Sequence, residues 1–471
     1  MKTIDKIYVN GAFVTPHGTE VAELINPSNN TVIGTVQLGD VEDTRKAIAS
    51  AKAAFKSFSK TTKEQRLEYL QKMYDAIAKR QDEFTDVMVQ EYGGTLQFSK
   101  MSTLNALNSI QSAMETLKQV ELIRTVGQSQ VHMEPVGVVG IITPWNASNS
   151  FISNKLSTAI AAGCPAVIKP SEMSALQTQI LTECLHEAGL PAGVFNIVNG
   201  RGDVVGAEIS RHPDIAKISF TGSTQVGKSI ARNAVDSMKR ITLELGGKSP
   251  NIILEDANFK TAVPLAVQAA FMNSGQACVA GTRLLVPETH LEEVKKLVKE
   301  TVEHVKVGNP QDADTAVGPL VSKKQYDRVQ SYIRLGLEEG AELLTGGIGQ
   351  PSGLEAGNFV KPTVFVNVKN QMRIAREEIF GPVLSVISYK TEEEAIEIAN
   401  DTDYGLQAYV SSSDEKRAHQ VAGQLNAGRV LVNCLKHDPM APFGGFKQSG
   451  LGREYGIFGL EAYLEPKTII E

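Results

Sequence analysis

Two hydrophobic patterns alternate along this chain. From Val136 onward, uninterrupted apolar runs are followed by segments in which apolar residues recur every three or four positions. The runs predict strands buried on both faces, and the segments predict amphipathic helices. This alternation is typical of βαβ units around a parallel sheet, so it predicts an α/β fold.

The predicted elements form two consecutive series. An N-terminal stretch comes first, with strands at 6–14 and 31–37 and helices at 43–58 and 61–92. In the first series, strands at 136–142, 166–169, 194–198, 217–221 and 241–245 alternate with helices at 150–162, 174–188, 204–210 and 225–236. The second series begins near Asn251, with helices at 259–273, 291–305, 323–337 and 392–400 and strands at 359–368 and 382–389. Gly246-Gly247 separates the series and is a natural hinge.

Composition narrows the class of protein. A length of 471 residues suggests about three domains. The net charge of −6 excludes the strongly basic character of a dedicated nucleic-acid binder. Four widely spaced cysteines form no CxxC pair, which argues against a zinc knuckle or a disulfide scaffold and fits a reducing compartment. No apolar run is long enough for a membrane helix, and we expect no metal site, a cytoplasmic location and no membrane partner.

One glycine-rich turn allows three interpretations. Residues 222–229 match the P-loop pattern G-x-x-x-x-G-K-[ST] between a predicted strand and a predicted helix. The match favours phosphoryl transfer if taken alone. The turn is also consistent with an ordinary strand-to-helix connection, or with a helix N-terminus that binds a dinucleotide pyrophosphate. The pattern does not separate these alternatives.

Two side chains are candidates for catalysis, one as a nucleophile and one as a base. Cys278 follows Gln276 and the small Ala277 in a predicted turn, so its thiol is expected to be accessible, although most cysteines are buried and inert. Glu244 lies inside an apolar run that ends in two glycines. It is either the polar face of an edge strand or a general base whose pKa burial raises.

Two further polar segments follow predicted strands, where parallel sheets bind their ligands. Asn146, after the only tryptophan, is either a helix cap or an amide that donates to an oxyanion. Lys169 and Glu172 either begin a helix or hold ribose hydroxyls.

Taken together, these segments resemble the NAD(P)-dependent aldehyde dehydrogenases over nearly the whole length. The landmarks occur in the family's order, namely 144–146, 169–172, 220–227, 243–248, 275–278, 377–382 and 442–450. Each motif is weak alone, but seven in order are specific. The resemblance also favours a dinucleotide over a P-loop nucleotide at residues 222–229.

The resemblance implies a catalytic role for three residues. Cys278 is the expected nucleophile, Glu244 the general base, and Asn146 with the backbone N–H of Cys278 the oxyanion hole. Thiolate addition to an aldehyde gives a thiohemiacetal, loss of hydride gives a thioester, and water activated by Glu244 releases the acid. The resemblance thus implies a hydrolytic NAD(P)-dependent aldehyde dehydrogenase of EC class 1.2.1.

The resemblance also implies a cofactor site and an architecture. The expected cofactor contacts are Trp145, Lys169, Glu172, Gly222, Ser223, Gly227, Leu245, Glu378 and Phe380, with Phe443 in the substrate funnel. NAD is the expected cofactor because a carboxylate at Glu172 repels a 2′-phosphate, with NADP as the alternative. The expected domains are a Rossmann-like NAD-binding domain (1–117 and 136–246), a catalytic domain (247–455) and a small β oligomerisation element (118–135 and 456–471). A homodimer or homotetramer is expected, and the identity of the aldehyde is left open.

Overall fold

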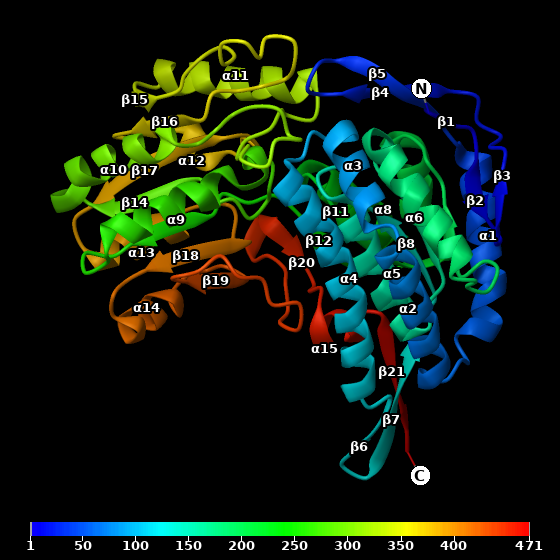
Figure 1. Cartoon of the computed structure of the whole chain (residues 1–471). Helices are drawn as coiled ribbons and strands as arrows, with labels where there is room; N and C mark the ends of the chain where they lie inside the picture. Colours follow the sequence, from blue (N-terminus) through cyan, green and yellow to red (C-terminus); the bar gives the residue numbers. More distant parts are fainter. Residues whose placement is uncertain (1, 471) are drawn as a thin grey trace.

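The computed structural model describes residues 2–470, which form two lobes side by side (Figure 1). Each lobe contains a largely parallel sheet with helices packed on it. The predicted α/β class with two doubly wound sheets is confirmed. We call the lobe with the N-terminal half of the chain the cofactor lobe, and the other the catalytic lobe.

The cofactor lobe contains an eight-stranded sheet. Its spatial order is β20 (Gly450–Leu451), β12 (Arg240–Glu244), β11 (Ile215–Thr221), β8 (Val138–Ile142), β9 (Ala166–Lys169), β10 (Phe195–Ile197), β2 (Ile7–Val9) and β3 (Ala12–Val14). The five central strands are parallel. The first of them in sequence, β8, pairs with β9 on one side and β11 on the other. A crevice for a ligand opens at the carboxyl ends of strands where the order reverses in this way.

The catalytic lobe contains a seven-stranded sheet. Its order is β15 (Glu342–Thr345), β16 (Thr363–Val366), β17 (Val383–Tyr389), β14 (Arg283–Pro287), β13 (Pro250–Ile253), β18 (Gln407–Ser411) and β19 (Arg429–Val432). Only β15 is antiparallel to its neighbour among these described strands. Two three-stranded sheets complete the fold, β1 (Lys2–Ile4), β5 (Thr31–Gln37) and β4 (Val21–Asn26), and β21 (Leu464–Ile469), β7 (Ser129–Pro135) and β6 (Ile123–Val126).

Helices cover both faces of these sheets. They are α1 (Val41–Phe58), α2 (Lys63–Ala78), α3 (Gln81–Glu91), α4 (Leu96–Gln119), α5 (Ser148–Ala162), α6 (Ala175–Glu187), α7 (Ala207–Arg211), α8 (Thr224–Val235), α9 (Phe259–Phe271), α10 (Leu291–Glu303), α11 (Lys323–Glu338), α12 (Arg373–Arg376), α13 (Glu392–Asn400), α14 (Glu415–Ala422) and α15 (Gly456–Glu461). Shorter helical turns are η1 (Glu172–Ser174), π-helical η2 (Gly202–Gly206), η3 (Met272–Gly275), η4 (Glu288–His290) and η5 (Lys447–Ser449).

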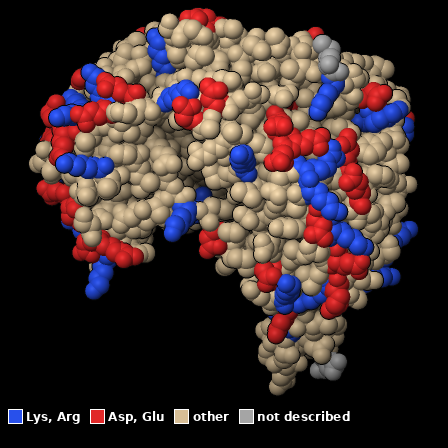
Figure 2. Space-filling model, in the orientation of Figure 1, with Lys and Arg blue, Asp and Glu red and all other residues tan. Residues whose placement is uncertain are grey.

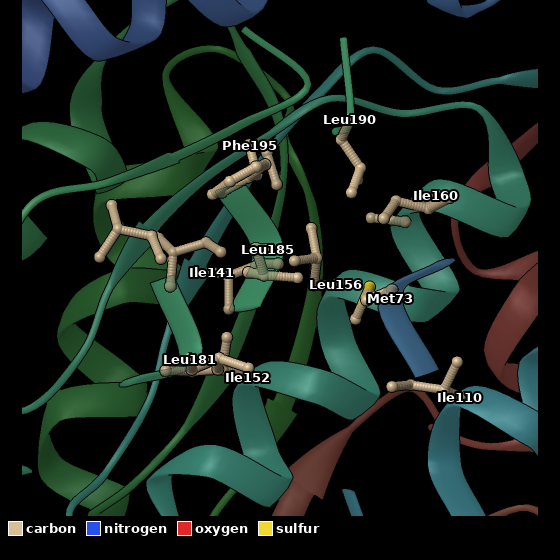
Figure 3. Packing of buried hydrophobic residues seen from close by; sticks show 14 of the residues in the cluster. Met73, Ile110, Ile141, Ile152, Leu156, Ile160, Leu181, Leu185, Leu190 and Phe195 are labelled. Atoms are coloured by element: carbon tan, nitrogen blue, oxygen red, sulfur yellow. The ribbon is translucent and has the colours of Figure 1, made fainter. Parts of the chain in front are cut away.

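The apolar strand β8 shows why these strands read as continuous hydrophobic runs. Val138 and Ile142 point into one core with α1, α7 and α8, whereas Val139 and Ile141 point into the other with α2, α4, α5 and α6. Figure 3 shows Ile141 packed among residues of the second core, including Ile152 of α5. A strand covered on both faces has no polar face, so its sequence does not alternate.

Several predicted elements are wrong in extent. The predicted strand at 6–14 is a hairpin of β2 and β3, turned by Asn10 and Gly11 at positive φ. The predicted helix at 61–92 is two helices, α2 and α3, which break at Lys79 and Arg80. The sequence did not predict α4, although it is the longest helix in residues 2–470.

The strand pairing also bears on the expected domain limits. The chain leaves the cofactor sheet after β12 and enters the catalytic sheet at β13, with Gly246-Gly247 between them. However, β20 lies within the expected catalytic range and pairs with β12 in the cofactor sheet. The helix α15, which falls in the expected oligomerisation element, packs on α4 and α5. Within residues 2–470, no helix has the length and apolar character needed to cross a membrane.

Candidate active site between the two sheets

A cavity of about 280 Å³ lies between the two lobes. Its wall includes Cys278, Glu244, Asn146 and Phe443, four of the residues that the sequence singled out. Glu244 ends β12 of the cofactor sheet, whereas Cys278 precedes β14 of the catalytic sheet. The carboxyl end of one sheet therefore faces the amino end of the other across the cavity. Figure 2 shows the surface hollowed between the lobes, with acidic and basic side chains interspersed around it.

The turn before Cys278 has an unusual backbone. Three successive residues in η3, Asn273, Ser274 and Gly275, have φ of 51°, 56° and 71°. Left-handed conformations cost energy for residues with a Cβ, and they persist where surrounding contacts fix them. The predicted helix at 259–273 therefore ends at Phe271, two residues earlier than expected.

A network of side chains holds this turn. Tyr92 donates its hydroxyl proton to Asn273 Oδ1 at 2.9 Å, and Gln276 Nε2 donates to the Tyr92 oxygen at 3.2 Å. Gln276 Oε1 accepts from the backbone N–H of Val321 at 3.0 Å. Ser274 Oγ accepts from the backbone N–H of Gly318 at 3.0 Å. The loop that carries Cys278 is thus fixed from both lobes.

The Cys278 thiol is half-buried in the cavity wall. Burial, and after it the negative charges of Glu378 and Glu244, raise the pKa of the Cys278 thiol to about 12. The nearby cation of Arg429 acts in the opposite direction. The thiol is therefore protonated at neutral pH in this structure, and a nucleophilic step requires a base.

Glu244 is the acidic residue in the cavity wall best suited to act as this base. It is 2% exposed, and neither carboxylate oxygen has a hydrogen-bond partner within residues 2–470. Burial, followed by the charge of Glu454, raises the pKa of Glu244 well above its ordinary 4.5. A Cβ at Gly444 would lie 2.7 Å from Glu244 Oε1, so glycine at that position leaves room for the carboxylate. The edge-strand interpretation fails, because β12 is paired on both sides.

Donors for an oxyanion lie beside the thiol. Asn146 is buried, and its Nδ2 donates to the backbone carbonyl of Gln276 at 3.0 Å. The backbone N–H of Cys278 donates to no protein acceptor among the described residues. A side-chain amide and a free backbone N–H in the wall of one cavity are the kind of donors that stabilise an oxyanion.

The crevice above β8, β9 and β11 holds most of the expected cofactor contacts. Lys169 Nζ pairs with Glu172 Oε2 at 3.0 Å beyond β9. Ser223 caps α8, where its Oγ accepts from the Val226 N–H at 3.4 Å, and Gly222 lies just before it. A Cβ at Gly227 would lie 2.4 Å from Leu245 Cδ2, so glycine there lets α8 pack closely on the end of β12.

Of the three remaining expected cofactor residues, Trp145 follows β8 of the cofactor lobe, and the other two come from the catalytic lobe. Glu378 Oε1 accepts from the backbone N–H of Gly247 at 3.0 Å, and burial raises the pKa of Glu378. The Phe380 ring lies edge-on to Trp145, with centroids 5.5 Å apart. Both lobes thus contribute to the crevice, next to the cavity that contains Cys278.

Unpaired polar atoms fit a polar ligand in this crevice. Thr143 Oγ1 and Asn199 Oδ1 are buried beyond the carboxyl ends of β8 and β10, and neither has a hydrogen-bond partner among residues 2–470. Buried polar atoms are rarely left unpaired without a ligand or water. The crevice therefore fits a group rich in hydroxyl and phosphate oxygens, such as a dinucleotide.

The P-loop interpretation has no support in this geometry. Lys228 Nζ donates to Gln448 Oε1 at 2.8 Å on the protein surface. A P-loop site would also need an acid after an apolar strand to hold magnesium. The candidate, Asp256, follows β13 in the other sheet and accepts from Ser412 and Asp414. A phosphate-binding turn and its magnesium-binding acid normally lie on one sheet.

Sequence reasoning missed three residues around the cavity, Tyr92, Arg429 and Glu454. Tyr92 ends an ordinary amphipathic helix, and Arg429 opens an ordinary strand. Glu454 is 7% exposed and pairs with Lys155 and Asn154. Nothing in their local sequence marked them, because their neighbours in space are distant along the chain.

Comparisons with known proteins point to one family. Residues 13–469 match the model of the aldehyde dehydrogenase family. A 3-succinoylsemialdehyde-pyridine dehydrogenase from a Pseudomonas species is 44% identical over 472 residues, covering 100% of this chain and 99% of that protein. A crystal structure of a mutant aldehyde dehydrogenase C from Pseudomonas syringae, complexed with NAD+ and octanal, is 44% identical with a TM-score of 0.97, covering 99% of this chain and 96% of that one. Betaine aldehyde dehydrogenase from Staphylococcus aureus, in complex with NAD+, is 37% identical with a TM-score of 0.96, covering 99% and 94%.

Proposed function

The chain belongs to the aldehyde dehydrogenase family, and from that premise we propose that it oxidises an aldehyde to a carboxylic acid with NAD+ through Cys278. The observation that carries the assignment of roles is the meeting of Cys278, Glu244 and Asn146 in the wall of one cavity. The three come from separate parts of the chain and supply a nucleophile, a base and an oxyanion donor.

Glu244 is suited to remove the thiol proton. A carboxylate whose pKa is raised is a stronger base than a solvated one. The raised pKa of Glu244 therefore brings it closer to the pKa of the Cys278 thiol, whose proton it would accept. Attack by the Cys278 sulfur on the aldehyde carbon then gives a thiohemiacetal oxyanion. The Asn146 amide and the Cys278 N–H would stabilise that oxyanion, and losing one such donor typically costs about 10²–10³ in rate.

The cofactor would lie in the crevice of the cofactor lobe. Lys169 and Glu172 would hold its adenosine ribose and Ser223 would approach its pyrophosphate. Glu378, Phe380 and Trp145 would contact its nicotinamide half. When bound, NAD+ supplies the acceptor for a hydride, and the loss of this hydride from the thiohemiacetal leaves a thioester. Glu172 favours NAD+ over NADP+ because a 2′-phosphate would approach a carboxylate.

Glu244 also accounts for release of the product. After oxidation, the acyl group is bonded to Cys278, and a water that gives its proton to Glu244 can attack the thioester carbon. The C–S bond then breaks, the carboxylic acid leaves, and the sulfur takes the proton back from Glu244. The buried position of Glu244, with both oxygens unpaired within residues 2–470, suits this second use of the same base.

The small sheet of β6, β7 and β21 supports the proposal of a homodimer or homotetramer. Figure 1 shows it extending away from the body of the molecule. The strand β21 pairs with β7 alone among the described strands, so its other edge offers backbone groups to a second subunit. The four unpaired thiols support a cytoplasmic location.

The first prediction tests the nucleophile. Cys278→Ala should lower NADH formation from aldehydes by more than about 10³-fold, because no other group would carry the acyl intermediate. NADH absorbance measures the rate, and a fluorescence titration should show that NAD+ still binds. Cys184→Ala, which removes a thiol in the core of the cofactor lobe, is the matched control and should retain activity. Equal activity of the Cys278 variant would rule out the proposed mechanism.

A further inference from the structure

One cation in the cavity wall has no role in the chemistry above. Arg429 is the first residue of β19 and lies opposite Gln407 of β18 in the parallel register. Its Nε donates to Gln407 Oε1 at 2.6 Å. Its Cζ lies 4.9 Å from the centre of the Phe443 ring. The guanidinium is therefore held in one position at the amino end of the catalytic sheet.

The histidine beside Arg429 does not carry a competing charge. Arg429 Nη1 lies 2.8 Å from His437 Nδ1. Burial and the positive charge of Arg429 lower the pKa of His437 to about 4, so the imidazole is neutral at neutral pH and its Nδ1 can accept this hydrogen bond. His437 fixes the guanidinium without neutralising it.

Arg429 lacks a negative partner inside the protein. Within residues 2–470, no Asp or Glu forms an ion pair with it, and two of its N–H groups donate to neutral acceptors. A guanidinium has five N–H groups in a planar fork that matches a carboxylate. A half-buried cation without a counter-ion is unfavourable, so the site is poised to accept an anion from outside the protein.

Charge is divided across the cavity. The acids in its wall, Glu244 and Glu454, lie at or near strands of the cofactor sheet. Arg429 begins β19 of the catalytic sheet, and Lys436 lies in the segment that follows β19. The rest of the wall is largely apolar, with side chains such as Phe151 and Leu435. In low-polarity surroundings a charge acts strongly on its neighbours, so the charge of Arg429 orients an anionic ligand.

Arg429 is also tied to the loop that carries the nucleophile. Gln407 Nε2 donates to the Tyr409 hydroxyl oxygen, and the Tyr409 hydroxyl donates to the carbonyl of Val279 at 2.8 Å. Val279 follows Cys278 directly. The guanidinium and the thiol are thereby linked through the wall of one cavity, at a spacing fixed by the sheet.

We infer that the substrate is an aldehyde with a carboxylate at the end remote from its carbonyl, and that Arg429 binds this carboxylate while Cys278 attacks the carbonyl. The inference rests on the proposed function and specifies its substrate class. Arg429 acts here as a specificity-determining residue. A neutral aldehyde would leave the guanidinium unpaired.

The test compares matched pairs of substrates. The rates of NADH formation from 4-oxobutanoate and butanal, and from 5-oxopentanoate and pentanal, are measured for the wild-type chain, Arg429→Met, Arg429→Lys and Arg334→Met. Arg429→Met keeps an unbranched apolar stem and removes the charge, and Arg334→Met is a control on an exposed helical arginine. The ratio of kcat/KM within each pair cancels any effect of Arg429 on the reactivity of Cys278.

The wild-type chain should prefer the carboxylated member of each pair. Arg429→Met should reduce that preference by about 10- to 100-fold, as expected for a lost charged hydrogen bond. Arg429→Lys should keep part of the preference, and Arg334→Met should match the wild type. An unchanged preference in Arg429→Met, or a wild-type preference for the neutral aldehydes, would overturn the inference while leaving the proposed function intact. If no aldehyde is oxidised, the proposed function fails and the inference with it.

Discussion

At the scale of single residues, the site depends on carboxyl groups that the fold keeps out of water. Glu244 and Glu378 are both buried, and burial is the main cause of the raised pKa of each. A raised pKa means that the folded protein opposes ionisation of the carboxyl group, so the folded state is less stable at high pH. The same raised pKa makes the ionised carboxylate a stronger base. The sequence hinted at this only through an acid inside an apolar run.

Glu244→Gln should change both the turnover of the enzyme and the pH dependence of its stability. Turnover should fall by about 10²–10⁴, because a general base is lost. The stability effect has a definite sign. The folded pKa lies above 4.5, so the stability that the protonated carboxyl provides is complete below that pH and is lost as pH rises through the folded value. The wild type should therefore lose stability with rising pH across this window, relative to Glu244→Gln.

Thermal unfolding at a series of pH values measures the second effect. The difference in melting temperature between the two proteins isolates Glu244, since all other groups titrate in both. Glu68→Gln, at an exposed position on α2, serves as the control and should follow the wild type. A difference that does not change with pH would mean that Glu244 is ionised normally in the folded protein.

At the scale of elements, hydrophobic periodicity predicted the parts of the fold that bury apolar residues. The predicted limits of β9 and α13 agree with the structure, since both follow a clear pattern between turn residues. The helix α4 was missed because much of its buried face consists of small polar residues, including Ser102, Ser109 and Ser112. Hydroxyl groups that bond within a helix or to a neighbour can be buried, but they interrupt the apolar pattern.

The candidate site was likewise predicted only in part from the sequence. Cys278, Glu244 and Asn146 were identified because their types and neighbours are distinctive. The three left-handed residues before Cys278 were not, since Asn273 and Ser274 also occur in ordinary helices. Their conformation is imposed by contacts with Tyr92 and Gly318, which lie far away in sequence.

Gly275→Ala should disrupt this turn. A Cβ there would lie 2.2 Å from the backbone carbon and oxygen of Gly381, and backbone cannot move aside as a side chain does. The matched control is Gly340→Ala, at φ +81° with no atom within 4 Å of the added Cβ. The free energy of unfolding of Gly340→Ala should fall by about 1–2 kcal/mol, because alanine is strained in the left-handed conformation.

Gly275→Ala should therefore lose more stability than Gly340→Ala, as well as most of its activity, because the Cys278 loop must shift. Urea unfolding and NADH formation measure the two effects. Equal losses of stability in the two variants, with activity retained, would show that the close approach of residues 275 and 381 is not required.

At the scale of the whole molecule, the projecting sheet of β6, β7 and β21 bears on assembly. Ile123 and Val126 of β6 are 58% and 61% exposed, although both are apolar. Exposed apolar residues on a projecting sheet are typical of a subunit interface. We propose that this sheet packs against a second copy of the chain.

Replacing Ile123 and Val126 together with lysine should lower the oligomeric state, because two charges would be buried at the contact. Light scattering at micromolar concentration measures the mass, and circular dichroism checks the fold. Ile348→Lys, at an apolar position of similar exposure in the catalytic lobe, should leave the mass unchanged. A double variant that keeps the wild-type mass would exclude β6 from the interface.

The route of the chain between the lobes has a mechanical consequence. It crosses from one sheet to the other twice within residues 2–470, at 245–249 and at 433–449. The first crossing leads directly from Glu244, and the second includes Phe443 in the cavity wall. Both crossings therefore lie next to the reaction centre. If one lobe rotated on the other about these crossings, atoms would move in proportion to their distance from them, so the sulfur and the carboxylate would keep nearly the same separation.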